Sequence, residues 1–152
     1  MRIYNLFPLL AGPFENWNNH FVGAAEMGFN WVFVNPIQKL GASGSLYSIA
    51  DYLSINPVFC SNGKESPEDQ VRTMVAEAQK LGLNMMIDLV INHSAYDSAL
   101  LKKHPEWFVK ENGRVANPFC MHVVKKWFGM TWHNLTTITH PMQRVYIGFA
   151  GI

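Results

Sequence analysis

The sequence predicts an α/β fold built on a parallel sheet. Two apolar stretches, at 30–36 and 84–90, are long enough for strands and lack the alternation of a half-exposed strand, as is typical of strands buried on both faces. Residues 25–35 and 78–90 follow the same order: the end of a helix, a glycine, an asparagine and then the apolar stretch. Repeated helix-then-buried-strand units require crossover connections, so the sheet is either doubly wound or closed as a (β/α)8 barrel.

Proline and glycine mark the limits of the first elements. Residues 2–7 are β-prone and stop at Pro8. A helix is expected from Trp17, where apolar residues recur at helical spacing, and Gly28 ends it. The stretch 30–36 is then the second strand.

The second helix has a start encoded in its sequence. Residues 37–65, which precede it, are expected to form a long loop, and such a loop in a compact domain is usually functional. Ser66 suits the N-cap, Pro67 the first helical position, and Asp69 closes a turn like a capping box. The helix ends at Gly82. Its expected core stripe consists of Val71, Met74, Val75, Ala78 and Leu81.

Composition excludes several function classes. A net charge of +1 without a basic stripe does not indicate nucleic-acid binding. Two cysteines give no disulfide framework and eight methionines fit a reducing interior, so a cytoplasmic location is expected. No segment has the roughly 18 apolar residues of a membrane span. The N-terminal segment is interrupted by Asn5 and Pro8, and no signal peptide is expected.

The third strand ends in polar residues that suit a binding site. The run IDLVINH carries one acid, Asp88, and closes with Asn92 and His93, whose side chains can bind a metal or hydrogen-bond a ligand. In parallel α/β folds the carboxyl ends of the strands carry the chemistry. A histidine at a strand end is, without further context, more often structural.

Three segments together resemble the α-amylase family of retaining glycosidases and transglycosidases, glycoside hydrolase family 13. They are DLVINH at 88–93, GSLYSIADYLSINPVF at 44–59 and AEMGFNWVFVNP at 25–36, and the resemblance covers residues 2–122. The segments RIYNLFPLLAGP, SGSLYSI and HPEWF are most similar to the maltosyltransferase branch, which transfers maltose from maltose 1-phosphate onto α-1,4-glucan.

The resemblance implies an incomplete (β/α)8 TIM barrel. Its first three strands with two helices would occupy residues 1–93, and the start of the insertion after strand 3 would occupy 94–122. A complete barrel needs about 250 residues, so an N-terminal fragment is expected. In the family the catalytic acids lie on strands four, five and seven. The resemblance covers only the first three strands, so no residue of this chain is assigned as a catalytic acid. Glu106 and Glu111 lie on a polar segment with nothing to raise a pKa, so the chain is expected to be inactive alone.

The resemblance also implies residue roles. His93 would hydrogen-bond sugar hydroxyls in the subsite of the transferred glycosyl unit, and Tyr47 would stack on that sugar or, alternatively, pack its own loop. Asp88 would be a buried anchor of the strand end, and Asp51 would cap or pin the loop 41–56. The expected partner is an α-1,4-glucan or a maltose-type saccharide.

Calcium is left open, and no cofactor is required. Asn92 matches a position that binds calcium in many amylases, but one amide oxygen is no calcium site, which needs about six to eight oxygen ligands. Trp107 and Phe108 suit a small core better than a sugar platform. The competing function is a non-catalytic part-barrel that binds a saccharide or self-associates through an exposed sheet edge. GASGSL at 41–46 is no phosphate loop, because no helix follows it.

The last residues follow no strand or helix period. When 125–152 are given plausible codons and read from the third base of each codon, the product contains a tryptophan, Asp-Leu-Ala, an aspartate and Glu-Gly-Leu-Tyr, which resembles the family at this place. We therefore expect 123–152 to be a non-native tail after a single-base deletion following His122. A divergent native tail is the alternative.

Overall fold

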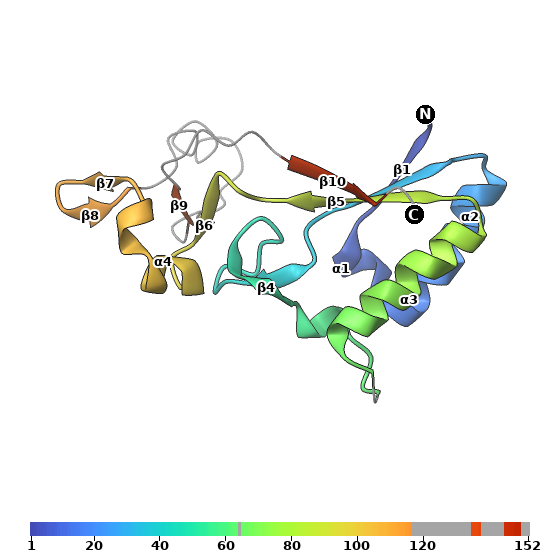
Figure 1. Ribbon diagram of the computed structural model, residues 1–152, viewed down its shortest axis with the longest axis horizontal. Helices are drawn as coiled ribbons and strands as arrows, with labels where there is room; N and C mark the ends of the chain where they lie inside the picture. The colour runs from blue at the N-terminus through green and yellow to red at the C-terminus, as the bar shows by residue number, and fades with distance from the viewer. Residues whose placement is uncertain (64, 117–134, 138–144, 150–152) are drawn as a thin grey trace. The chain divides into compact units, whose positions relative to one another are not determined.

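The computed structural model describes residues 1–63 and 65–116, together with strands at 135–137 and 145–149 (Figure 1). The chain divides into two compact units. Unit 1 comprises residues 1–37, 55–89 and 146–152, and unit 2 comprises 38–54 and 90–145.

Unit 1 is built on a four-stranded sheet. Its strands, in sheet order, are β1 (Ile3–Leu6), β2 (Trp31–Val34), β5 (Asn84–Leu89) and β10 (Val145–Phe149). The pairs β1–β2 and β2–β5 are parallel, with Trp31 opposite both Ile3 and Asn84. The predicted parallel sheet and its first three strands are therefore confirmed. Within the described residues the sheet is not closed into a barrel.

Two longer helices pack beside this sheet. They are α2 (Trp17–Glu26) and α3 (Pro67–Lys80), which contact each other, and α3 also contacts β5 (Figure 1). Both predicted glycine stops are confirmed, because Gly28 and Gly82 adopt φ of 79° and 72°, which residues with a Cβ rarely adopt. The Ser66 hydroxyl accepts a hydrogen bond from the Asp69 amide at 3.1 Å, as the capping motif predicts.

Short helical segments complete unit 1 and its aromatic core. They are α1 (Pro8–Ala11), η1 (Phe14–Asn16) and η2 (Pro57–Phe59). Trp17 is fully buried, meets Phe14 edge-on at a centroid distance of 4.9 Å, and donates its indole N–H to the Gly12 carbonyl at 2.8 Å. The predicted core stripe of α3 is confirmed only in part: Met74 and Ala78 are buried, Val71 and Val75 are half-buried, and Leu81 is 36% exposed, whereas Leu83 is 1% exposed. The helix ends at Lys80, so Leu81 no longer follows the helical stripe.

Unit 2 contains short strands where the sequence predicted a loop. Residues 37–65 were expected to be without regular structure, but β3 (Gln38–Leu40) and β4 (Ile49–Ile55) form a two-stranded sheet. The Gly41 amide donates to the Ser48 carbonyl at 2.7 Å and closes the connection between them. Neither strand shows a long apolar run, because β3 has only three residues and both strands are only partly buried.

The rest of unit 2 follows the third strand of the parallel sheet. His93 begins β6 (His93–Ala95), which pairs antiparallel with β9 (Leu135–Thr137). The short helix α4 (Ala99–Lys103) comes next, followed by η3 (Pro105–Trp107). A turn joins β7 (Lys110–Glu111) to β8 (Arg114–Val115), with Asn112 and Gly113 at positive φ.

The expected tail from residue 123 lies outside the described residues, apart from β9 and β10. The sequence patterns predicted neither strand. The proposed frameshift and the boundaries at 93 and 122 stay predictions. Among the described residues, no helix has the length and apolar character needed to cross a membrane.

Candidate functional site

The connection that carries Tyr47 is packed tightly onto the β6 segment. A Cβ on Gly41 would collide with the Ala95 Cβ and would lie 2.6 Å from an Asp97 carboxylate oxygen, so only glycine fits. The other Asp97 oxygen accepts a hydrogen bond from the Ala42 amide at 3.1 Å. Tyr47 follows this anchored turn and is half-buried. The predicted saccharide-stacking residue is thus on a fixed segment.

His93 is held on both its ring and its backbone. Its Nδ1 lies 2.9 Å from the Asn92 side-chain oxygen. Because an amide oxygen can only accept, this contact favours the tautomer with the proton on Nδ1, in which Nε2 is an acceptor. The His93 carbonyl accepts a hydrogen bond from the Tyr52 hydroxyl at 2.7 Å. The ring contact therefore favours one tautomer, and the backbone of His93 is hydrogen-bonded to β4.

Tyr52 is a positioning residue to which the sequence assigned no role. It belongs to the Tyr-x-x-x-Asp-Tyr segment that carried part of the family resemblance. Burial raises the pKa of the Tyr52 phenol well above its usual range, so the hydroxyl stays protonated and remains a donor. No local pattern identifies it, because burial along β4 does not alternate: Ile49 and Ala50 are both buried, and Asp51 and Tyr52 are both half-buried.

Asp51 makes local contacts within β4. One carboxylate oxygen accepts from the Ser54 hydroxyl at 2.7 Å, and the other accepts from the Leu53 amide at 3.0 Å. These two hydrogen bonds lower the pKa of Asp51 below its usual value. The contacts are of the kind expected for a residue that pins its loop, a role that stays a prediction.

The predicted site residues do not all lie in one unit. Tyr47, Asp51, Asn92 and His93 belong to unit 2, and the structure brings Asn92 and His93 into direct contact. Asp88 lies in β5 of unit 1 and is 2% exposed, which agrees with the expected buried position. Its role as an anchor of the strand end stays a prediction.

The role of Asn92 as a calcium ligand stays a prediction. Its side-chain oxygen faces the His93 Nδ1, and calcium needs about six to eight oxygen ligands. In the part of the chain that the structure describes, no group of three or more His, Cys, Asp or Glu side chains could hold a metal ion.

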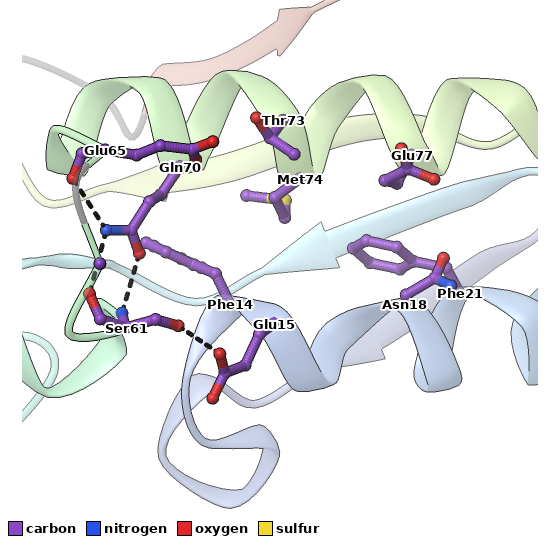
Figure 2. Close-up of a pocket in the computed structure, with 11 residues that line it drawn as sticks. Phe14, Glu15, Asn18, Phe21, Ser61, Glu65, Gln70, Thr73, Met74 and Glu77 are labelled. Carbon is purple, nitrogen blue, oxygen red and sulfur yellow. Dashed lines mark hydrogen bonds between the residues drawn. The ribbon is translucent and has the colours of Figure 1, made fainter.

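A hollow of about 600 Å³ lies elsewhere, in unit 1 between the segment η1–α2 and helix α3 (Figure 2). Its floor is apolar, and Figure 2 shows Ser61 bonded both to Glu15, at 2.8 Å, and to Gln70, at 2.8 Å. It contains none of the residues predicted to bind saccharide. The apolar floor consists of Phe14, Phe21 and Met74.

Comparison with known sequences assigns the chain to a family. The family described as "Glycogen debranching enzyme, glucanotransferase domain" matches residues 1–112. The glycogen debranching enzyme of Saccharomyces cerevisiae is 35% identical over 93 residues, which are 60% of this chain and 6% of that protein. The cyclomaltodextrinase of Geobacillus thermopakistaniensis is 25% identical over 131 residues, which are 86% of this chain and 19% of that protein. The chain spans less than a fifth of either relative.

Solved structures agree with this assignment. An α-amylase from Lactobacillus plantarum has a TM-score of 0.73 at 24% identity, over 90% of this chain and 31% of the other, a likeness that shows the fold. A maltogenic α-amylase from Thermotoga neapolitana has a TM-score of 0.70 at 26% identity, over 91% of this chain and 31% of the other. The described fold thus aligns to part of an amylase domain. The chain belongs to the glycogen debranching enzyme glucanotransferase-domain family and, with it, to the α-amylase family, glycoside hydrolase family 13.

Proposed function

We propose that this chain forms the N-terminal part of the catalytic domain of an enzyme acting on α-1,4-glucans, and that His93 and Tyr47 bind one glucosyl unit. The observation that carries this proposal is the double fixation of His93, through its Nδ1 contact with Asn92 and its carbonyl contact with Tyr52. A side chain whose ring is already held by a neighbouring side chain loses less conformational freedom when it binds a ligand.

Each group has a distinct role in this proposal. His93 accepts a hydrogen bond from a sugar hydroxyl at Nε2, and Tyr47 covers the apolar C–H face of the same ring. Asp88 anchors the end of β5, and Asp51 pins the segment that carries Tyr47. The Nε2 atom of His93 is buried, so a saccharide reaches it only when neighbouring residues move. Binding is therefore expected to be accompanied by a local rearrangement.

The proposed reaction class is transfer of glucosyl units between α-glucans. The family that matches residues 1–112 is described by a glucanotransferase domain, and this supports transfer over hydrolysis. Membership of the maltosyltransferase branch is a narrower proposal, which rests on the sequence segments at 2–13, 43–49 and 104–108. Product analysis on the complete protein separates the alternatives, because transfer lengthens the glucan acceptor and hydrolysis releases reducing ends.

We also propose that these 152 residues have no glucan-cleaving activity by themselves. Retaining glycosidases need a proton donor and a nucleophilic carboxylate about 5–5.5 Å apart. A proton donor needs a raised pKa. Hydrogen bonds instead lower the pKa of Asp51 and that of the fully exposed Glu106. Both carboxyl groups therefore remain ionised near neutral pH and cannot donate the proton.

Metal dependence and location are proposals of the same kind. Saccharide binding by His93 is proposed to need no calcium, so a chelator should leave the affinity unchanged. A cytoplasmic location is proposed from the two cysteines and eight methionines in the sequence.

Calorimetric titration with maltotetraose tests the proposal. Saturable binding is expected, and His93→Ala should weaken it about fivefold, which corresponds to the roughly 1 kcal/mol of one hydrogen bond. His20→Ala, a change of a half-buried histidine on α2 of unit 1, is the matched control and should leave the affinity unchanged. The proposal fails if the chain binds no maltotetraose or if both variants bind like the original.

A second candidate function is strand pairing between copies. β1 lies at one edge of the unit 1 sheet, and Ile3 on this strand is 41% exposed. An uncovered strand edge can accept hydrogen bonds from another strand. Light scattering should then show a dimer that Asn5→Pro abolishes, because proline removes a backbone donor. A monomer at all concentrations would contradict this candidate.

A further inference from the structure

The two residues proposed to bind one sugar lie on different segments of unit 2. Tyr47 lies in residues 38–54, and His93 lies in residues 90–145. The strand β4, which follows Tyr47, pairs with β3, whereas β6, which begins at His93, pairs with β9. One sugar ring can contact both side chains only if the two segments keep a defined separation. The contacts that join the segments therefore determine the geometry of the subsite.

Two side-chain hydrogen bonds join the segments on either side of Tyr47. The Tyr52 hydroxyl donates to the His93 carbonyl at 2.7 Å. The Ala42 amide donates to an Asp97 carboxylate oxygen at 3.1 Å. Ala42 precedes Tyr47 in the chain and Tyr52 follows it, so the stretch that carries Tyr47 is tied to the other segment at both ends.

Hydrogen bonds within residues 41–48 make this turn a single body. The Gly41 amide donates to the Ser48 carbonyl at 2.7 Å, which joins the two ends of the turn. The Ser48 amide donates to the Ser45 carbonyl at 2.9 Å, and the Tyr47 amide donates to the Ser45 hydroxyl at 3.3 Å. A displacement at the start of the turn is therefore passed on to Tyr47.

Asp97 lies at a corner whose backbone is itself held in place. The next residue, Ser98, is fully buried, and its amide donates to the Ala95 carbonyl at 3.1 Å. The Ser98 hydroxyl accepts a hydrogen bond from the Leu100 amide at 3.1 Å and caps α4. The Asp97 oxygen that does not accept from the turn lies 2.6 Å from the place that a Cβ on Gly41 would take. Both carboxylate oxygens therefore lie against the start of the turn.

We propose that Asp97 is a positioning residue of the saccharide subsite: its carboxylate holds the turn that carries Tyr47 at the separation from His93 that one glucosyl ring requires. This role rests on the proposed function of Tyr47 and His93. Asp97 acts through the Ala42 amide and does not touch the sugar. A hydrogen bond from a backbone amide to a carboxylate is about twice as strong as one between neutral groups, which suits an aspartate to this place.

Calorimetric titration of three variants with maltotetraose tests the role of Asp97. Asp97→Ala removes the acceptor and should weaken binding by a factor of about 3 to 5, the effect of losing one hydrogen bond. Asp97→Asn keeps an acceptor oxygen at the same place and should weaken binding by less than about twofold. Glu111→Ala, which removes an exposed carboxylate from β7, is the matched control and should leave the affinity unchanged.

NMR spectra of the same variants separate positioning from loss of structure. In Asp97→Ala the signals of the Ala42 amide and of the Tyr47 ring should shift before any sugar is added. In Asp97→Asn both sets of signals should return towards their original positions. Because Asp97 is exposed, backbone signals outside residues 41–48 and 93–98 should stay unchanged in each variant.

The outcomes separate the role of Asp97 from the proposed function. If the original chain binds maltotetraose and Tyr47→Ala weakens binding but Asp97→Ala does not, the role of Asp97 is overturned and the proposed function stands. Equal losses in Asp97→Ala and Asp97→Asn also overturn it, because the acceptor oxygen would then make no difference. If the original chain binds no maltotetraose, the proposed function fails and the role of Asp97 fails with it.

Discussion

Tyr52→Phe removes one oxygen atom and tests how His93 is positioned. The Tyr52 hydroxyl donates to the His93 carbonyl at 2.7 Å across two elements of unit 2. The phenylalanine keeps the ring and its packing, so the change leaves a part-buried carbonyl without this donor. The cost of such a loss is about 1–3 kcal/mol. We expect the free energy of unfolding to fall by this amount and maltotetraose binding to weaken.

Urea unfolding of Tyr52→Phe and Tyr4→Phe provides the comparison. Tyr4 is half-buried, and its ring meets Phe29 edge-on at 5.6 Å, a contact that the phenylalanine keeps. Tyr4→Phe should therefore change stability by less than about 0.5 kcal/mol. If Tyr52→Phe costs no more than Tyr4→Phe, the hydroxyl does not fix His93 and the reasoning is refuted.

Stability measured at alkaline pH is a second test of the hydrogen bond between Tyr52 and His93. Burial raises the pKa of Tyr52, whereas in the unfolded chain the phenol ionises near pH 10. The contribution of Tyr52 to stability is therefore complete below about pH 10 and is lost as the pH rises towards the folded pKa. Tyr52→Phe should lose less stability between about pH 10 and pH 11.5 than the original chain. Equal slopes would contradict a buried, protonated phenol.

The remaining predictions concern Gly41 and Asp51. Gly41→Ala should destabilise unit 2 by about 1–3 kcal/mol through its collision with Ala95, measured by hydrogen exchange in β4 and β6. Gly23→Ala on α2 meets nothing within 4 Å and should be neutral or stabilising, so equal effects would exclude the collision. The lowered pKa of Asp51 means that its contribution is present above about pH 4 and lost as the pH falls through the folded value. In Asp51→Asn the free energy of unfolding should therefore fall less steeply as the pH drops below about 4. An unchanged pH dependence would show that the contact with Ser54 does not contribute to stability.

The parallel sheet could be predicted because its strands carry local signals. β2 and β5 are apolar runs that each follow a helix ending in a glycine, and buried parallel strands need such runs. β3 and β6 were missed because they have three residues each, and β4 was missed because it is only partly buried. Such strands take their pairing from tertiary neighbours and show little periodicity of their own.

The candidate site could be predicted only in part, for the same physical reason. His93 and Tyr47 stand out because their types and spacing match a family pattern. The role of Tyr52 depends on a hydrogen bond to a carbonyl 41 residues away, which no local pattern encodes. Trp107 and Phe108 are adjacent aromatic residues, and only the fold determines which of them is buried.

The central claim is that an α-glucan binds at His93, and the ring signals of this residue test it most directly. In a titration followed by histidine side-chain NMR, maltotetraose should shift the His93 resonances to saturation. The β-linked cellotetraose should leave them unchanged. Unmoved His93 signals with maltotetraose, or identical shifts with both sugars, would contradict the claim that this segment forms a glucosyl subsite.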